Sequence, residues 1–172
     1  MGQYYKPVSI DKMESLYSHD YDNMSKLMEH SYIGNDFVKV AEYLLSPKGQ
    51  WHMHSFVWAG DYADNEIDKD NNLFMLTEDK ELKIKNIPQE NIGNFIVNHT
   101  QKQYVDKSIC PTDEEGWCVH PLPLLTADGN GRGGGDYRLH NAWVGSWAKD
   151  VISVEKEAPK DYTEIVPNFK MD

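Results

Sequence analysis

Hydrophobic side chains recur at helical spacing in one long segment of the chain, residues 35–46. The apolar positions that repeat at i, i+3, i+4, i+7 and i+8 are Phe37, Val40, Ala41, Leu44 and Leu45. This spacing places apolar side chains on one face of a helix. Asn35 or Asp36 suits the capping position before the first turn, and Pro47 and Gly49 suit the end. The pattern predicts one clear amphipathic helix over about 35–46.

Short runs of β-forming residues dominate the rest of the chain. The expected strands are 4–10, 15–19, 51–59, 73–76, 82–87, 95–97, 102–105 and 151–155. Pro7 marks the first strand as an edge strand, because proline cannot donate to a β-ladder. Residues 118–125 form an apolar run interrupted by prolines, and 143–147 adds another aromatic run. Many short strands with one clear helix predict an α+β fold, built on a mainly antiparallel sheet with long loops.

The chain length fits one domain, since 172 residues are enough to bury a substantial core. We expect a single globular domain over residues 1–157. From Ala158 onward, prolines and mixed charges predict an extended C-terminal tail, residues 158–172, packed on the surface.

The charge balance narrows the choice of partners. The chain carries 17 basic and 28 acidic residues, a net charge of −11. Such a field repels phosphate backbones, so nucleic acid is disfavoured, whereas a basic protein partner or simple solubility fits it. No stretch approaches the roughly 20 apolar residues of a membrane span, and no signal-peptide pattern opens the sequence. The expected location is the cytoplasm, with no membrane partner.

One loop carries unusual chemistry. Residues 129–135 contain five glycines around Arg132, and acidic residues flank them. Glycine allows a backbone to approach a ligand closely, and an arginine can grip a carboxylate or phosphate. The predicted ligand-binding residues are Asp128, Asn130, Arg132, Asp136, Trp143 and Trp147. The leading interpretation is a binding domain that recognises a small anionic ligand or a protein partner through loop 128–136. The alternative for the loop itself is a hairpin tip or a mobile surface loop.

A second functional class stays open: a small enzyme acting on a nucleotide- or phosphate-like substrate, with or without a metal ion. The candidate catalytic residues are His120, Asp128, Asp136 and His140. Arg132 would hold the anion, and the acids and histidines would supply acid–base or metal-binding groups. The stretch is similar in part to the Fic signature, but His120 lies too far before Asp128 and a second arginine is missing. The sequence does not identify a cofactor.

Other metal-binding patterns are weaker. His52 and His54 are expected on one face of strand 51–59, where a His-x-His pair can bind zinc if folding brings His99, His120 or His140 near. Histidines on a half-buried strand are the preferred explanation of the pair. The acidic segment 61–72 alternates oxygen-bearing side chains but lacks the central glycine and closing glutamate of a calcium loop. We expect a solvated loop there and no metal site.

Five sequence blocks together resemble a family of small bacterial and phage-associated proteins that share them. The blocks are MGQYYK (1–6), LMEHS (27–31), GDYA (60–63), LLTADGNGRGGGDY (124–137) and VGSW (144–147). They span nearly the whole chain, and the glycine block is the most specific of them. No function is established for that family, so the resemblance implies no reaction, cofactor or site residue.

Overall fold

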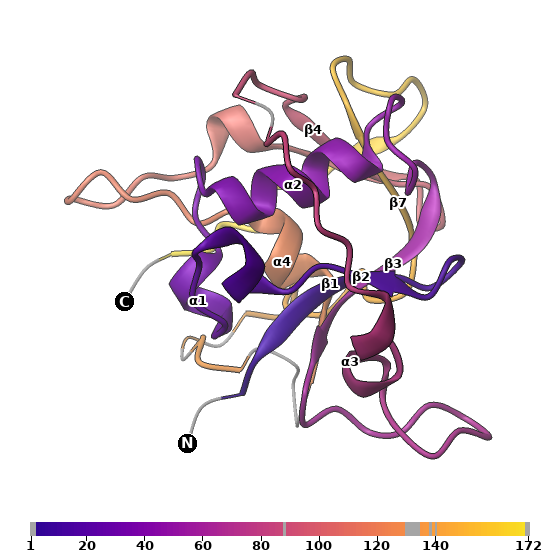
Figure 1. Cartoon of the computed structure of the whole chain (residues 1–172). Coiled ribbons are helices and arrows are strands. Elements are labelled where there is room, and N and C mark those ends of the chain that lie inside the picture. The colour runs from indigo at the N-terminus through magenta and orange to yellow at the C-terminus, as the bar shows by residue number, and fades with distance from the viewer. Residues whose placement is uncertain (1–2, 88, 130–134, 138, 140, 171–172) are drawn as a thin grey trace.

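The structure is a computed structural model that describes residues 3–87, 89–129, 135–137, 139 and 141–170. In these residues one eight-stranded sheet runs in the order β2-β1-β3-β7-β4-β5-β8, and β6 pairs with β3. The strands are β1 (Tyr5–Ser9), β2 (Glu14–Ser15), β3 (His54–Gly60), β4 (Phe95–Asn98), β5 (Gln103–Asp106), β6 (Ala127–Asp128), β7 (Val151–Glu155) and β8 (Thr163–Glu164). The helices are α1 (Leu27–His30), α2 (Asp36–Leu45), α3 (Leu73–Leu76) and α4 (Pro121–Leu125) (Figure 1). Short 3-10 turns lie at Ser18–Tyr21, Glu78–Lys80 and Lys107–Ile109.

The predicted fold class is confirmed: the protein is α+β with a mainly antiparallel sheet. The β3–β6 and β5–β8 pairs are parallel, and the other strand pairings among the described residues are antiparallel. The predicted amphipathic helix is α2, the longest helix described. The side chain of Asn35 caps it by accepting a hydrogen bond from the backbone N–H of Val38 at 3.1 Å. All five apolar residues of the predicted stripe are buried.

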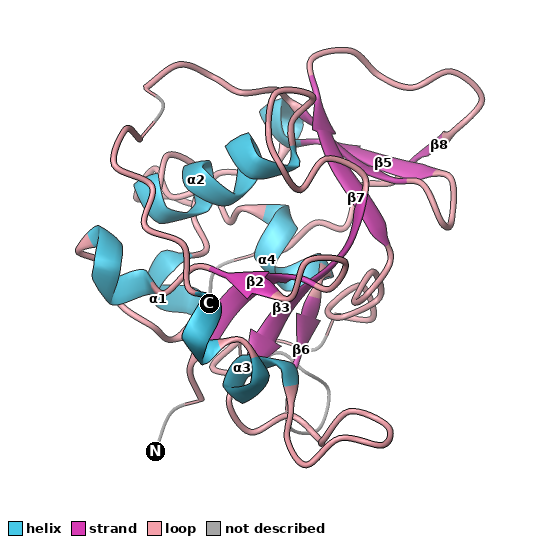
Figure 2. Cartoon of the chain, turned by 45° about the vertical axis from the view of Figure 1, so that its right-hand side comes forward, coloured by secondary structure: helices cyan, strands magenta, loops and turns pink. Residues whose placement is uncertain are grey.

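The sheet buries side chains on both faces near β3. Phe56 and Trp58 pack into the main core with Phe37 of α2. Val57 and Ala59 point the other way, as strand alternation requires, into a small cluster that includes residues of α3. Figure 2 shows this arrangement, with α2 and α4 on one side of the sheet and α3 beyond β3 on the other.

Several expected strands are wrong. Residues 73–76 form α3, because Asn72 caps the segment by accepting from the N–H of Met75 at 3.0 Å. Residues 82–87 form no strand: an isolated bridge joins Glu81 to Ser15, and the carbonyl of Leu82 accepts from the hydroxyl of Tyr21 instead. Residues 143–147 form turns. The second arm of the first hairpin shrinks to β2, two residues long.

Two proline-based expectations also change. Residues 121–125 form α4, because Pro121 stands at the first helical position, where a missing N–H costs nothing. Cys118 therefore lies before that helix, where an isolated β-bridge joins it to Thr112 and its carbonyl accepts from the N–H of Ile33 at 2.8 Å. β1 is not an edge strand, since β2 pairs beside it. Pro7 lies where that short ladder ends, and its carbonyl accepts from the N–H of Leu16 at 3.2 Å.

The segment after Ala158 contributes to both the sheet and the core. β8 pairs with β5, and the side chains of Ile165 and Phe169 are buried. The ring of Phe169 contacts Tyr137 edge to face, with the centroids 6.0 Å apart. The boundary at residue 157 stays a prediction. Among the described residues, no helix combines the length and the apolar character that crossing a membrane requires.

Candidate functional site

The described ends of the glycine-rich loop pack against Tyr5. A Cβ atom at Gly129 or at Gly135 would come closer than 3 Å to the tyrosine ring or its hydroxyl oxygen. Gly135 also has a φ of +56°, in the left-handed region that side chains rarely adopt. Two of the five loop glycines thus have a packing reason that needs no ligand. Asn130 and Arg132 lie outside the described residues, as does His140.

Negative charge surrounds these loop ends. Burial raises the pKa of Tyr5, and the charges of Asp136, Asp128 and Asp61 raise it further. Burial also raises the pKa of the Asp128 carboxyl, against the opposing charge of Lys149. The acidic groups around the described ends of the loop therefore disfavour an anion there.

Asp136 has a structural contact of its own. Its Oδ1 accepts a hydrogen bond from the backbone N–H of Met28 at 2.9 Å, which ties the end of the glycine-rich loop to α1. Burial raises the pKa of Asp136, and this hydrogen bond opposes the shift. The contact joins two of the five sequence blocks, 27–31 and 124–137, in space.

His120 belongs to a buried polar cluster with Glu42 and Lys107. Nδ1 of His120 accepts from the N–H of Leu122 at 3.2 Å, so the ring proton is on Nε2. Nε2 lies 3.2 Å from Oε1 of Glu42, and Glu42 also bonds the Lys107 ammonium. Burial lowers the pKa of His120, and its charged neighbours are Glu42 and Lys107. In the described part of the chain no contact joins His120 to Asp128 or Asp136.

The two predicted tryptophans differ in accessibility. Trp147 is completely buried, and its Nε1–H donates to Oε1 of Gln103 at 3.0 Å. Trp143 is half-buried against the main core. Trp147 is thus a core residue in this conformation. Of the two tryptophans, only Trp143 has exposed surface that a ligand could contact.

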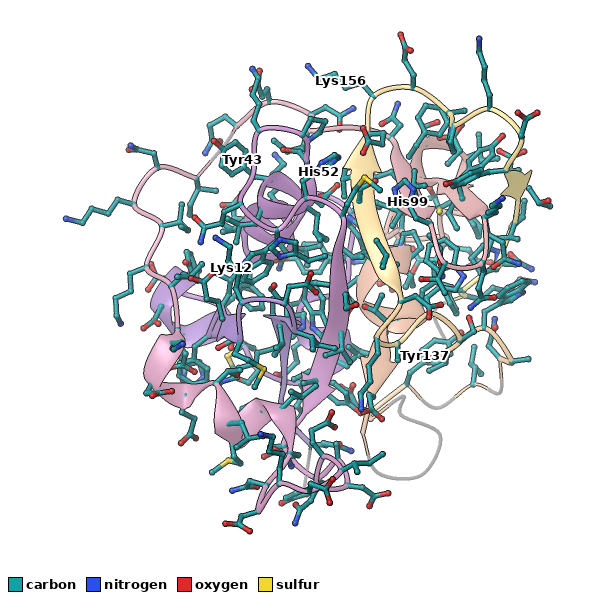
Figure 3. All side chains as sticks on the ribbon, turned by 90° about the vertical axis from the view of Figure 1, so that its right-hand side faces the viewer. Lys12, Tyr43, His52, His99, Tyr137 and Lys156 are labelled. Carbon is teal, nitrogen blue, oxygen red and sulfur yellow. The ribbon has the colours of Figure 1, made fainter. Side chains whose placement is uncertain are left out.

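A cavity of about 670 Å³ lies on another part of the molecule, which we call the His52 cavity. Its wall comes from the end of α2 and the turn after it, from residues 90–92, and from the end of β7 with residues 156–159. The apolar part of the lining includes Pro47, Met53 and Ile92. Figure 3 shows Tyr43, His52, His99 and Lys156 on this side of the protein.

A histidine–glutamate pair stands in the wall of the His52 cavity. Nε2 of His52 lies 2.8 Å from Oε2 of Glu155, and the two side chains are 30% and 26% exposed. The carboxylate fixes the ring so that neutral His52 carries its proton on Nε2. Nδ1 of His52 makes no hydrogen bond with any residue that the structure describes. It is therefore available to accept a hydrogen bond from a ligand.

His99 lies beside this pair but is held on both sides. Its Nδ1 is 3.0 Å from the hydroxyl of Tyr162, and its Nε2 is 2.7 Å from Oγ of Ser153. Burial lowers the pKa of His99, while Glu155 raises it and His52 lowers it, so the three groups interact. Ser153 is fully buried and serves as a hydrogen-bonding partner for the ring.

Strand register brings His52 and Glu155 together. β3 pairs antiparallel with β7, with His54 opposite Ile152, so the residues just before β3 lie beside the end of β7. β4 pairs with β7 on its other side, with Asn98 opposite Ile152, which places His99 nearby. The expectation that His52 and His54 share a strand face is wrong, because β3 begins at His54. That residue contacts Oγ of Ser9 at 2.8 Å, away from the cavity.

In the described ranges, no three His, Cys, Asp or Glu side chains are grouped in a way that could hold a metal ion. Cys110 and Cys118 are both free thiols, without a disulfide between them. Burial raises the pKa of the Cys110 thiol to about 12, which makes it a poor nucleophile.

Comparison with protein-family models, with curated proteins and with solved structures gave no match to this chain. The resemblance carried by the five blocks therefore stays a prediction.

Sequence reasoning picked out His52 and His99 but not the cavity that they line. It missed Glu155, the partner that orients His52, together with Tyr43 and the charged residues of the rim. The only local signal was the His-x-His pattern. The remaining lining residues come from segments whose proximity depends on the β3–β7–β4 pairing.

Proposed function

We propose that this protein is a binding domain and that its site is the His52 cavity. The observation that carries the proposal is the half-buried His52–Glu155 pair in the wall of a cavity of about 670 Å³. Small-molecule sites typically enclose about 300–1,000 Å³, with an apolar lining and a few converging polar groups. This cavity fits that description in both respects.

The charges of the lining favour a neutral or zwitterionic ligand. Glu90, Glu155 and Glu157 line the cavity, against Lys48 and Lys156. With neutral histidines the lining is slightly acidic, and the whole chain carries −11. The negative field of the lining repels a phosphate group. A compact neutral or zwitterionic molecule is not repelled, because its polar groups can contact both the acidic and the basic residues while its apolar part contacts the apolar lining. The group that faces Nδ1 of His52 is a hydrogen-bond donor.

The glycine-rich loop remains a second candidate for binding a small anion or a protein partner. Its support is the glycine content and Arg132. The acidic residues at its described ends, Asp128 and Asp136, together with Asp61 near Tyr5, favour a basic protein partner over a small anion.

An enzymatic function is supported by the same His52–Glu155 pair. A carboxylate that orients an imidazole is the arrangement of a general base, with Nδ1 of His52 as the group that removes the proton. The reaction class would be proton abstraction from a bound small molecule. If the wild-type protein converts a bound ligand and Glu155→Gln does not, the enzymatic function is established. If the ligand binds without being converted, the protein is a binding domain.

The first test is a thermal-shift screen against nucleosides, amino acids, nucleotides, sugar phosphates and divalent metals. A specific ligand raises the free energy of unfolding by about 2.7 kcal/mol at a hundredfold excess over its dissociation constant. The proposal expects a neutral or zwitterionic hit that is lost in His52→Ala and kept in Arg132→Ala. His54→Ala is the matched control, since that residue contacts Ser9 instead of the cavity. A hit lost in Arg132→Ala but kept in His52→Ala would move the site to the loop.

A further inference from the structure

Trp117 is held in an exposed position by a well-defined turn. The N–H of Asp113 donates to the carbonyl of Trp117 at 2.8 Å, and an isolated bridge joins Thr112 to Cys118. Oδ1 of Asp113 accepts from the N–H groups of Glu115 and Trp117, at 3.0 and 2.8 Å. The tryptophan is nevertheless 46% exposed. A large aromatic side chain on a fixed turn has little conformational freedom left to lose on binding.

The ring of Trp117 borders a cavity of about 480 Å³, which we call the Trp117 pocket. Tyr32 contacts the ring edge to face, with the centroids 5.0 Å apart and an interplanar angle of 85°. Val119 and Phe169, each 3% exposed, line the same pocket. The pocket thus combines an apolar base with an accessible aromatic ring, and Tyr32 contacts that ring.

The rim of the Trp117 pocket is acidic. Asp113, Glu114 and Glu115 line it, and Lys170 is the basic residue of the lining. Glu114 and Glu115 are exposed and form no ion pair with any described residue. An acidic rim beside an accessible tryptophan attracts a cation to the ring face.

We propose that the Trp117 pocket binds an arginine side chain from a basic segment of a protein partner. A guanidinium stacks on the face of an aromatic ring and bonds carboxylates in the same plane, which a lysine ammonium does less well. The net charge of −11 steers a basic segment toward the protein. This surface lies on different segments from the His52 cavity, so this proposal and the proposed function can fail independently.

The test uses an acetylated hexa-arginine peptide as the probe and the indole N–H signal of Trp117 as the readout, assigned by NMR with Trp117→Phe. We expect a saturable shift of that signal. We also expect affinity to fall about fivefold in Trp117→Ala and in the double variant Glu114→Gln/Glu115→Gln. The matched control removes the same charge elsewhere, in Asp68→Asn/Asp70→Asn, two exposed positions of the acidic segment. Affinity should be nearly unchanged there.

Three results would overturn the proposal. The first is no movement of the Trp117 signal. The second is an equal loss of affinity in the control double variant, which would show that net charge alone attracts the peptide. The third is binding of hexalysine as tightly as hexa-arginine, which would remove the assignment of an arginine. Circular dichroism of each variant confirms that the fold is kept, as the exposure of all substituted residues leads us to expect.

Discussion

Nε2 of His52 lies 2.8 Å from Oε2 of Glu155, although 103 residues separate the two in the sequence. The pair is only partly buried, so solvent screens its charges, and such pairs contribute about 0–1 kcal/mol to stability. Its position in a cavity wall is easier to explain by what it can offer a ligand than by what it adds to the fold.

Replacing Glu155 tests that distinction. We expect Glu155→Gln to change the free energy of unfolding by less than about 1 kcal/mol, because the lost pair is screened. Binding of a ligand at Nδ1 of His52 should weaken by about tenfold, because a neutral amide holds the ring less strongly than the carboxylate does. Urea unfolding and a titration of the same variant give both numbers. A stability loss several times larger would make the pair a structural feature.

The buried His30 makes stability depend on pH. Its Nδ1 donates to the carbonyl of Met24 and its Nε2 accepts from Nε1–H of Trp58, each at 2.9 Å. Burial lowers the pKa of His30 from 6.5 to about 4. The neutral ring therefore stabilises the fold fully above about pH 6.5, and this contribution is lost as the pH falls toward 4. The shift corresponds to on the order of 3 kcal/mol.

Unfolding of wild type, His30→Gln and the exposed control His19→Gln across this pH range checks the prediction. His99 and His120 also have lowered pKa values, so wild type loses stability for more than one reason. We expect His30→Gln to be less stable and to show a shallower slope than wild type. An unchanged slope would mean that His30 does not titrate as proposed.

Glu42 lies between Lys107 and His120 in the core. Burial alone would raise its pKa, but its interactions with His120 and Lys107 outweigh burial and lower it. Its contribution is thus present above the unfolded pKa and is lost as the pH falls. Removing one member of a buried pair costs about 3–5 kcal/mol. We expect Glu42→Ala to lose stability in that range by urea unfolding, and exposed Glu78→Ala to lose little. Similar values for both would contradict the account.

The contact of Tyr5 with the glycine-rich loop predicts the effect of a methyl group there. Gly129→Ala should destabilise the protein by roughly 1–3 kcal/mol, because the Cβ atom overlaps both Oε1 of Gln3 and the tyrosine hydroxyl. In a Tyr5→Phe background the cost should shrink, since neighbouring changes are not additive. Chemical denaturation of the three variants measures the coupling. Equal costs in both backgrounds would remove this explanation for the glycine.

Local signals in the sequence were enough to predict α2 and the fold class. The helix has its own cap, Asn35, and a complete apolar stripe, so no distant contact is needed to define it. The strand predicted at residues 73–76 was wrong. A short apolar run fits either a strand or a helix, and here the cap from Asn72 stabilises the helix. The helix α4 was missed for a similar reason, since its prolines occupy positions that tolerate them.

The candidate site depends on contacts that no local pattern contains. His52 carries a recognisable His-x-His signal, but its partner is set by the pairing of β3 with β7. The glycine-rich loop attracted attention by composition, and two of its glycines prove to pack on Tyr5 from the other end of the chain. A high glycine content predicts an unusual backbone conformation or a close approach to the backbone. Only the folded structure shows whether the approaching group is a neighbouring side chain or a ligand.

The most direct test of the central claim follows the ring C–H signals of His52 and His54 by NMR while the best ligand from the screen is added. The account predicts that the His52 signals shift and saturate at the affinity of the ligand, and that the His54 signals stay in place. Saturable binding that leaves the His52 signals unmoved would contradict a binding site in the His52 cavity.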